Sequence, residues 1–249
     1  RNSPMWHVHP VLSTNVIVKN VKVIGHGPNN DGCNPESCSD VLIEGCYFDT
    51  GDDCIAIKSG RNNDGRRVNV PSENIIIQSC KMRDGHGGVV IGSETTGGVR
   101  NIFAENCTMD SPNLDRMLRI KTNSVRGGII ENIYLRNMTI GQVAEAVVNI
   151  NFLYGEGDSG NYTPTVANIN LENITSRKSR YALSIRAYDR SPVTNIRLKD
   201  CTFDNVEKPN ELVGVENLVF ENVKINGNVL NKTVNEAASL GSSSSRKFP

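Results

Sequence analysis

Apolar and polar residues alternate in short segments that recur along most of this chain. The recurring pattern is asparagine, apolar, any, apolar, any, asparagine, apolar, and residues 15–21 are its first copy. Alternation with a period of two is typical of β-strands, whereas a helix would place apolar residues three and four apart. Repeats spaced by 22 to 36 residues predict a solenoid of β-strand coils. The further copies, the first of them looser, span residues 40–46, 74–80, 101–107, 132–138, 168–174, 195–201 and 217–223.

The sixth position of each copy predicts a tight bend. The residues found there tolerate a left-handed backbone or bond to their own main chain. The residue after each bend should then point inward, toward the core. The bend residues are Asn20, Gly45, Ser79, Asn106, Asn137, Asn173, Asp200 and Asn222.

A second strand follows in most coils, with isoleucine as its inward residue. Because side chains alternate along a strand, the residues on either side of each isoleucine should face outward. Arg119 and Lys121 flank one of them and should project together. Stacked coils should lie about 4.8 Å apart. The aligned isoleucines are Ile57, Ile91, Ile120, Ile150 and Ile185.

Three short polar strings, at residues 29–31, 51–53 and 84–87, occupy matching places in successive coils. Asp52 and His86 each precede the inward isoleucine of their own coil by five residues, so they should be neighbours. Asp31 precedes Asp52 by 21 residues, about one shortened coil, and should lie beside it. Adjacent like charges repel and disfavour ionisation, so such a cluster is costly to assemble. We therefore interpret it as an active site.

Three carboxylates, one imidazole and two cations should meet on this surface. One carboxyl can donate a proton while another activates water, provided that neighbours keep one of them protonated. Guanidinium and ammonium groups suit an anionic polymer. The residues alone thus suggest hydrolysis of an acidic polysaccharide. A Ca²⁺ site is the chemical alternative, but Arg119 and Lys121 would repel a cation.

The order Asn-x-Asp, Gly-Asp-Asp, Gly-His-Gly and Arg-Ile-Lys resembles glycoside hydrolase family 28, the polygalacturonases and related pectinases. Residues 80–93 are similar to the histidine-centred signature of that family, and the resemblance covers residues 1–225. It implies an all-β fold, a right-handed parallel β-helix of about eight coils. It also implies hydrolysis of 1,4-linked α-galacturonosyl bonds with inversion at the anomeric carbon.

The resemblance implies a role for each catalytic candidate. Asp52 matches the general acid of the family, and Asp31 and Asp53 match the pair that activates water. His86 matches the imidazole that tunes the protonation of the acid.

It also implies a substrate-binding set. Arg119 and Lys121 match contacts to the substrate carboxylate, and Asn29 matches the asparagine that opens the first motif. The insert at residues 60–67 resembles bacterial and exo-acting members, which favours exo action. A galacturonan substrate and a secreted or periplasmic location follow from the same resemblance. We expect no cofactor and no metal.

Two expectations concern the ends of the chain. We expect residues 1–230 to form the catalytic β-helix and residues 231–249, rich in serine toward the end, to be a flexible tail. Family members usually carry several coils before the first motif, where this chain has barely one. A bare β-helix end exposes a strand edge, so we expect another segment or another chain to cover it.

The charge balance and the apolar runs limit the possible binding partners, and the cysteine positions indicate the state of the thiols. Lysine plus arginine and aspartate plus glutamate number 27 each, so no overall basic charge recruits nucleic acid or an anionic membrane. No apolar run is long enough to span a bilayer. Four of the seven cysteines should lie inward as free thiols, because they follow the predicted bends. A disulfide between Cys33 and Cys38 remains an open option.

Three other functions stay in competition. A pectate-lyase-like enzyme on the same fold would cleave by elimination with Ca²⁺. A non-catalytic β-helical binding protein would keep the repeats but have no reason to keep the four motifs. A rhamnogalacturonan hydrolase would generally lack the Gly-His-Gly and Arg-Ile-Lys strings, which His86, Arg119 and Lys121 provide here.

Overall fold

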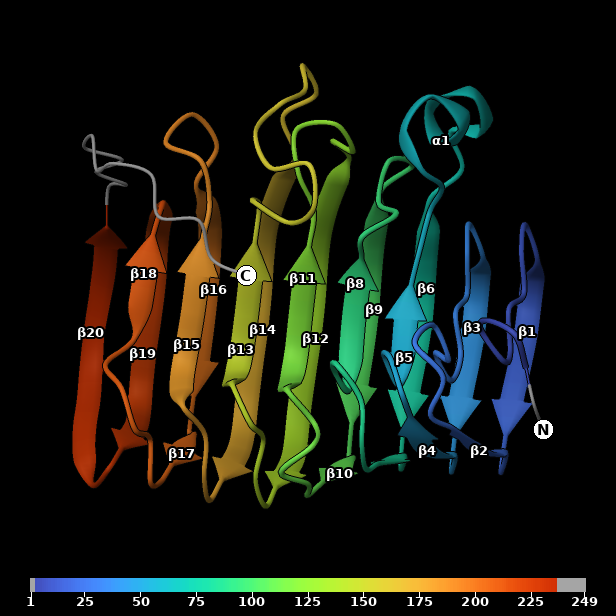
Figure 1. Cartoon of the computed structure of the whole chain (residues 1–249). Coiled ribbons are helices and arrows are strands. Elements are labelled where there is room, and N and C mark those ends of the chain that lie inside the picture. Colours follow the sequence, from blue (N-terminus) through green and yellow to red (C-terminus); the bar gives the residue numbers. More distant parts are fainter. Residues whose placement is uncertain (1–2, 237–249) are drawn as a thin grey trace.

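The computed structural model describes residues 3–236 and shows the expected right-handed parallel β-helix (Figure 1). Each coil contributes to a large sheet and most contribute to a second, smaller sheet. The smaller sheet is formed by β5 (Ile55–Ile57), β8 (Val89–Gly92), β11 (Arg116–Lys121), β13 (Ala146–Asn151), β15 (Tyr181–Arg186) and β18 (Glu211–Val213).

The large sheet gives the number of coils. Its long parallel strands are β1 (Thr14–Lys19), β3 (Ser39–Glu44), β6 (Ser72–Gln78), β9 (Val99–Glu105), β12 (Ile129–Ile140), β14 (Thr165–Ser176), β16 (Val193–Lys199) and β19 (Val215–Ile225). These eight strands confirm the expected eight coils. Shorter strands that join the same sheet are β2 (Lys22–Gly25), β4 (Tyr47–Thr50), β7 (Lys81–Met82), β10 (Thr108–Met109) and β17 (Thr202–Phe203).

The predicted bends are confirmed at all eight sixth positions, where φ lies between 50° and 62°. The sequence did not predict a second set of left-handed residues at the first position of each motif, such as Asn132 with φ 58°. Their side chains form a ladder: Asn132 donates to Asn101 at 3.2 Å, and Asn168 donates to Asn132 at 3.1 Å. A left-handed residue is strained unless its own side chain or a neighbour stabilises it. The ladder supplies that stabilisation and fixes one coil against the next.

The core is a set of columns of identical or similar side chains. Ile43, Ile77, Ala104 and Leu135 are fully buried and lie opposite one another in β3, β6, β9 and β12. All seven cysteines are buried and unpaired, which decides against a Cys33–Cys38 disulfide. Burial raises the pKa of Cys54 and of most other thiols, so they behave as small apolar groups here.

The second predicted strand is confirmed in register. Ile57 pairs with Ile91, Ile91 with Ile120, Ile120 with Ile150, and Ile150 with Ile185. All five side chains are fully buried. The flanking residues of each strand therefore face away from this column, on the side where the polar motifs lie.

The expected tail boundary was wrong. Residues 231–236 belong to β20 (Asn228–Glu236), which pairs antiparallel with β19 and closes the last coil. Residues 237–249 of the expected tail lie outside the described residues.

At the other end of the β-helix, β1 has β3 as its single strand neighbour among the described residues, and Ile17 is 69% exposed. None of the described helices could span a membrane.

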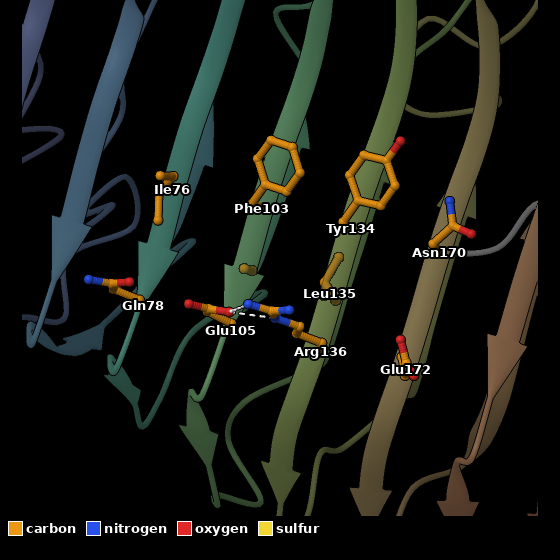
Figure 2. A pocket seen from close by; sticks show the side chains of 10 residues that line it. Ile76, Gln78, Phe103, Glu105, Tyr134, Leu135, Arg136, Asn170 and Glu172 are labelled. Atoms are coloured by element: carbon orange, nitrogen blue, oxygen red, sulfur yellow. Dashed lines mark hydrogen bonds and ion pairs between the residues drawn. The ribbon is translucent and has the colours of Figure 1, made fainter.

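An apolar stripe crosses the outer face of the large sheet (Figure 2). Ile76, Phe103 and Tyr134 lie at equivalent positions of β6, β9 and β12, in a shallow groove flanked by the Arg136–Glu105 ion pair. The two aromatic rings stack with centroids 5.0 Å apart and an interplanar angle of 7°. On the outer face, this stripe repeats the stacking of equivalent side chains from coil to coil. The four sequence motifs do not line it.

Candidate active site

Backbone hydrogen bonds between coils bring the polar motifs together. The amide of Gly32 donates to the carbonyl of Asp53 at 3.0 Å, and the amide of His86 donates to the carbonyl of Asp52 at 3.1 Å. Residues 31, 53 and 87 therefore occupy equivalent places in three successive coils. The acids and the imidazole meet because the sheet registers are fixed on both sides of this turn.

Asp52 and His86 form a hydrogen-bonded pair at the surface. His86 Nδ1 lies 3.0 Å from Asp52 Oδ1, and the carboxyl side chain is more buried than the imidazole. Burial would raise the pKa of Asp52, but the hydrogen bond from His86 and the charge of Lys121 outweigh it and lower the pKa. The hydrogen bond to Asp52 likewise raises the pKa of His86 above its ordinary value. Between these two pKa values the proton of the pair therefore resides on the imidazole.

Asp53 is fully buried between two cations. Lys121 Nζ donates to its Oδ2 at 2.6 Å, and Arg119 Nη1 donates to its Oδ1 at 3.4 Å. A buried carboxylate is stable when such charged donors compensate the lost hydration. The two cations predicted to contact substrate thus also hold one of the acids.

Asp31 is the acid most strongly perturbed by its surroundings. Its carboxyl is 2% exposed and accepts a 2.6 Å hydrogen bond from Asn34, while the ammonium of Lys58 lies 3.9 Å away. Burial and the negative charge of Asp53 raise the pKa of Asp31 to about 7, although Lys58 opposes this. Near neutral pH this carboxyl is consequently close to half protonated.

The two asparagines of the first motif differ in their surroundings. Asn29 is exposed, and its side chain makes no hydrogen bond within residues 3–236. Asn30 is buried and donates to the carbonyls of Ser3 and Met5 at 3.0 Å each, which fastens the first described residues to this turn. The role of Asn29 in binding substrate stays a prediction, whereas Asn30 is structural.

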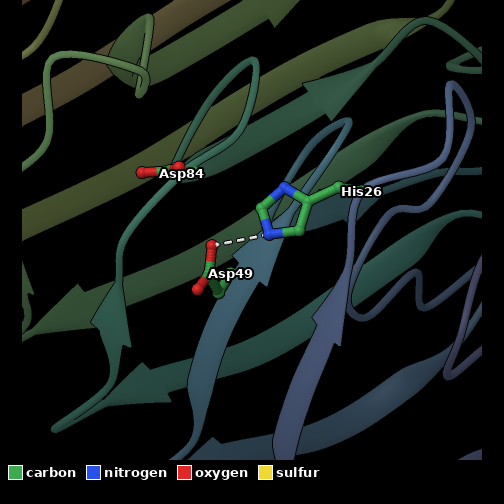
Figure 3. Close-up of side chains that lie close together, drawn as sticks. All are labelled: His26, Asp49 and Asp84. Carbon is green, nitrogen blue, oxygen red and sulfur yellow. Dashed lines mark ion pairs between the residues drawn. The ribbon is translucent and has the colours of Figure 1, made fainter. Parts of the chain in front are cut away.

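A second polar cluster lies at the start of the motif turns (Figure 3): His26 and Asp49 precede the first two polar strings, and Asp84 opens the third. His26 Nε2 lies 3.1 Å from Asp49 Oδ1, and Asp84 is close to both. Arg83 approaches the two carboxylates at 3.6 and 3.9 Å. Asp84 also accepts hydrogen bonds from Ser111 and Asn113. The guanidinium offsets the charge of both carboxylates, and the Ser111 and Asn113 donors hold Asp84, so we interpret the cluster as a support for the turns that carry the acids.

Comparison with known proteins places the chain in a family. The sequence profile of glycosyl hydrolases family 28 matches residues 1–218 of the 249. The chain belongs to this family.

A crystal structure of a hyperthermoactive exopolygalacturonase from Thermotoga maritima superimposes with a TM-score of 0.91 and 42% identity, covering 95% of this chain and 53% of that one. A probable polygalacturonase of Vitis vinifera is 32% identical over 208 residues, 81% of this chain and 42% of the relative. The exo-poly-alpha-D-galacturonosidase of Dickeya chrysanthemi is 29% identical over 158 residues, 59% of this chain and 26% of the relative. The chain spans about half or less of the length of these proteins.

Sequence reasoning missed two residues that shape this family 28 site. The first is Lys58, which is buried beside Asp31. It occupies the same position of its coil as Gly92 and Lys121 do in theirs, and this alignment could have identified it as a site residue. The ring of Tyr154 lies 5.3 Å from the ammonium of Lys121 and 5.6 Å from the guanidinium of Arg119. It comes from the loop after β13, which the strand pattern does not describe.

We predict that Asp31→Asn changes the pH dependence of stability. Wild-type Asp31 ionises near pH 3.8 when unfolded but only near 7 when folded, so its contribution to stability falls as the pH rises between these values. Relative to wild type, the variant should gain up to about 4 kcal/mol in free energy of unfolding between pH 4 and pH 8. Urea denaturation at several pH values measures this gain. A constant difference between the two proteins would contradict the burial argument.

Proposed function

We propose that this chain hydrolyses 1,4-α-D-galacturonosidic linkages of polygalacturonate with inversion, and that it acts from a chain end. The observation that carries the proposal is the meeting of three aspartates, one histidine and two cations on successive coils of a family 28 β-helix. The 42% identity to an exopolygalacturonase supports the exo mode. The three aspartates and His86 serve catalysis, and Arg119, Lys121 and Asn29 serve binding.

Asp52 would act as the general acid through its pair with His86. In the free enzyme the pair holds one proton, mainly on the imidazole, because the hydrogen bond between the two groups and the charge of Lys121 lower the pKa of Asp52, and the same hydrogen bond raises the pKa of His86. A sugar bound over the exposed imidazole would exclude water and disfavour the separated charges. The proton then moves to Asp52, from which the oxygen of the leaving sugar can receive it. This assigns to His86 the role of a proton reservoir.

Asp53 and Asp31 would activate the attacking water on the other side of the bond. Asp53 is balanced by Lys121 and Arg119, and Asp31 can accept a proton at the upper end of its titration. One Asp31 oxygen, Oδ1, is buried and accepts no hydrogen bond within residues 3–236, so its lone pairs are unused. An inverting mechanism needs such a base opposite the acid.

Arg119 and Tyr154 would form the contact to the sugar. The guanidinium of Arg119 offers several donors and spends one, at 3.4 Å, on Asp53. Its remaining donors suit the carboxylate of a galacturonate unit. The Tyr154 ring next to both cations provides a flat face for a sugar ring. These groups distinguish an acidic sugar from a neutral one.

Loops that contact one another beside the acids support action at a chain end, since they would block a polymer from extending in that direction. Helix α1 (Asn62–Val68) follows β5, and its Arg66 donates to the carbonyls of Val125 and Arg126 at 3.2 Å. Arg126 in turn pairs with Glu156 at 2.9 Å. The loops that carry Arg66 and Arg126 follow β5 and β11, directly after Lys58 and Lys121, so they border the acids on one side. A substrate of this kind also implies a secreted or periplasmic enzyme.

We predict that the chain releases galacturonic acid monomer from polygalacturonate and that chelator does not reduce the rate. Product chromatography gives the chain-end preference, and proton NMR of the first product gives its anomeric configuration. Mixed oligomers would replace the exo mode by endo action. Unsaturated products that absorb in the ultraviolet, together with a need for Ca²⁺, would identify a lyase instead.

We predict that Asp52→Asn reduces kcat by at least about a thousandfold and leaves substrate binding within a factor of a few, because it removes the proton and little shape. Calorimetry with a galacturonate oligomer measures the binding. Asp49→Asn, in the neighbouring cluster of Figure 3, is the matched control and should keep far more activity. Wild-type turnover in Asp52→Asn would rule out the acid assignment.

We predict that Lys121→Met both raises KM and lowers kcat, because the 2.6 Å pair with buried Asp53 is lost together with the substrate contact. Steady-state kinetics separate the two effects. Lys199→Met, which removes an exposed ion pair with Glu172 on the large sheet, is the control and should leave both constants near wild type. An unchanged KM in Lys121→Met would contradict the binding role.

A further inference from the structure

One buried cation near the acids has no place in the mechanism above. Lys58 follows β5 and is 3% exposed. Its ammonium lies 2.8 Å from Glu94 Oε2, 3.4 Å from the carbonyl of Gly92 and 3.9 Å from Asp31 Oδ2. The Trp6 ring covers it at 4.4 Å from the centroid. Burial of a lysine charge is costly, so this position must be compensated by its neighbours.

Two acids compensate the buried positive charge of Lys58, and they do so unequally. Burial would raise the pKa of Glu94, but the charge and the direct hydrogen bond of Lys58 outweigh it and lower that pKa to about 2. Glu94 therefore stays ionised throughout the useful pH range. Asp31, in contrast, lies at the edge of ion-pair distance and keeps a raised pKa. Lys58 is thus anchored to Glu94 and acts on Asp31 from a fixed position.

The other groups around Asp31 also bear on its charge. Asp53 and Asp52 raise its pKa, and Asn34 lowers it through a hydrogen bond. The ring of His7 contacts its backbone carbonyl at 2.8 Å, not its carboxyl. Arg119 and Lys121 are engaged with Asp53. Among the described side chains, the ammonium in ion-pair contact with the Asp31 carboxyl is that of Lys58.

We propose that Lys58 and Glu94 form a positioning pair that sets the charge of Asp31, and thereby the pH range in which this carboxylate accepts a proton from the attacking water. The pair acts through Asp31 and does not touch substrate. The inference rests on the proposed hydrolytic function for its kinetic consequence. Its electrostatic part concerns the free protein alone.

Two substitutions should move the Asp31 titration in opposite directions. Lys58→Met removes the positive charge, so the pKa of Asp31 should rise from its value of about 7. Glu94→Gln removes a negative charge and frees Lys58 for Asp31, so the pKa of Asp31 should fall. A general loss of structure would not produce changes of opposite sign.

The experiment is a carbon-13 NMR titration of the Asp31 carboxyl, assigned with Asp31→Asn, in wild type and both variants. We expect the titration midpoint to move by about one pH unit or more, upward in Lys58→Met and downward in Glu94→Gln. The pH at which kcat/KM on polygalacturonate falls on the acid side of the profile should shift together with the Asp31 midpoint. At pH 6, Lys58→Met should therefore lose about tenfold in kcat/KM for each pH unit by which the midpoint rises. Lys199→Met should leave both titration and profile in place.

The outcomes separate the two proposals. An unmoved Asp31 titration in a folded, active enzyme overturns the role of the pair. Midpoints displaced with the expected signs in a protein that does not cleave polygalacturonate uphold the pair and overturn the proposed function. If Lys58→Met does not fold, Glu94→Gln alone decides, since it is nearly isosteric: a lower midpoint supports the inference, and an unchanged or higher one overturns it.

Discussion

The whole structure depends on parallel strand pairing held in a single register from coil to coil. Residues 31, 53 and 87 are remote in sequence, and the site exists because backbone hydrogen bonds align their coils. A slip of one residue would turn every side chain of a strand to the opposite face. The asparagine ladders oppose such a slip, since Asn101 and Asn168 both bond to Asn132 at a fixed place in each coil. Register is thus the structural requirement for bringing these side chains together.

The same stacking forces acids into contact and must balance them. Buried Asp53 is neutralised by Lys121 and Arg119, whereas Asp31 receives one ammonium at 3.9 Å. This inequality places chemically identical side chains in different electrostatic surroundings. The pairing of Asp52 with His86 adds a third environment, closer to solvent. An acid–base mechanism needs such a division, and the β-helix provides it by placing one aspartate in each of three settings.

The sequence predicted most of the repeating features, apart from the left-handed residue at the first position of each motif, and missed several features outside the repeat. Asn20 and its equivalents revealed the bends, and Ile57 and Ile91 revealed the register of the smaller sheet, because each occurs once per coil. The extent of β20 was missed, since an antiparallel strand lies outside the repeat. Tyr154 reaches Lys121 from a loop whose path depends on tertiary contacts. Periodicity therefore finds the scaffold, while loop residues of the site need coordinates.

Lys58 shows how far the pattern could have been followed. It lies in line with Lys121, and the alternation predicts that both face outward from the core. The Lys58 side chain points away from the core but is not exposed to solvent, because Trp6 and Glu94 cover it. A charged residue that is directed away from the core and is nevertheless 3% exposed must lie under another layer of polar groups. In a β-helix that layer gathers where several coils present charges together, so a buried lysine in line with the acids marks the site as clearly as the acids do.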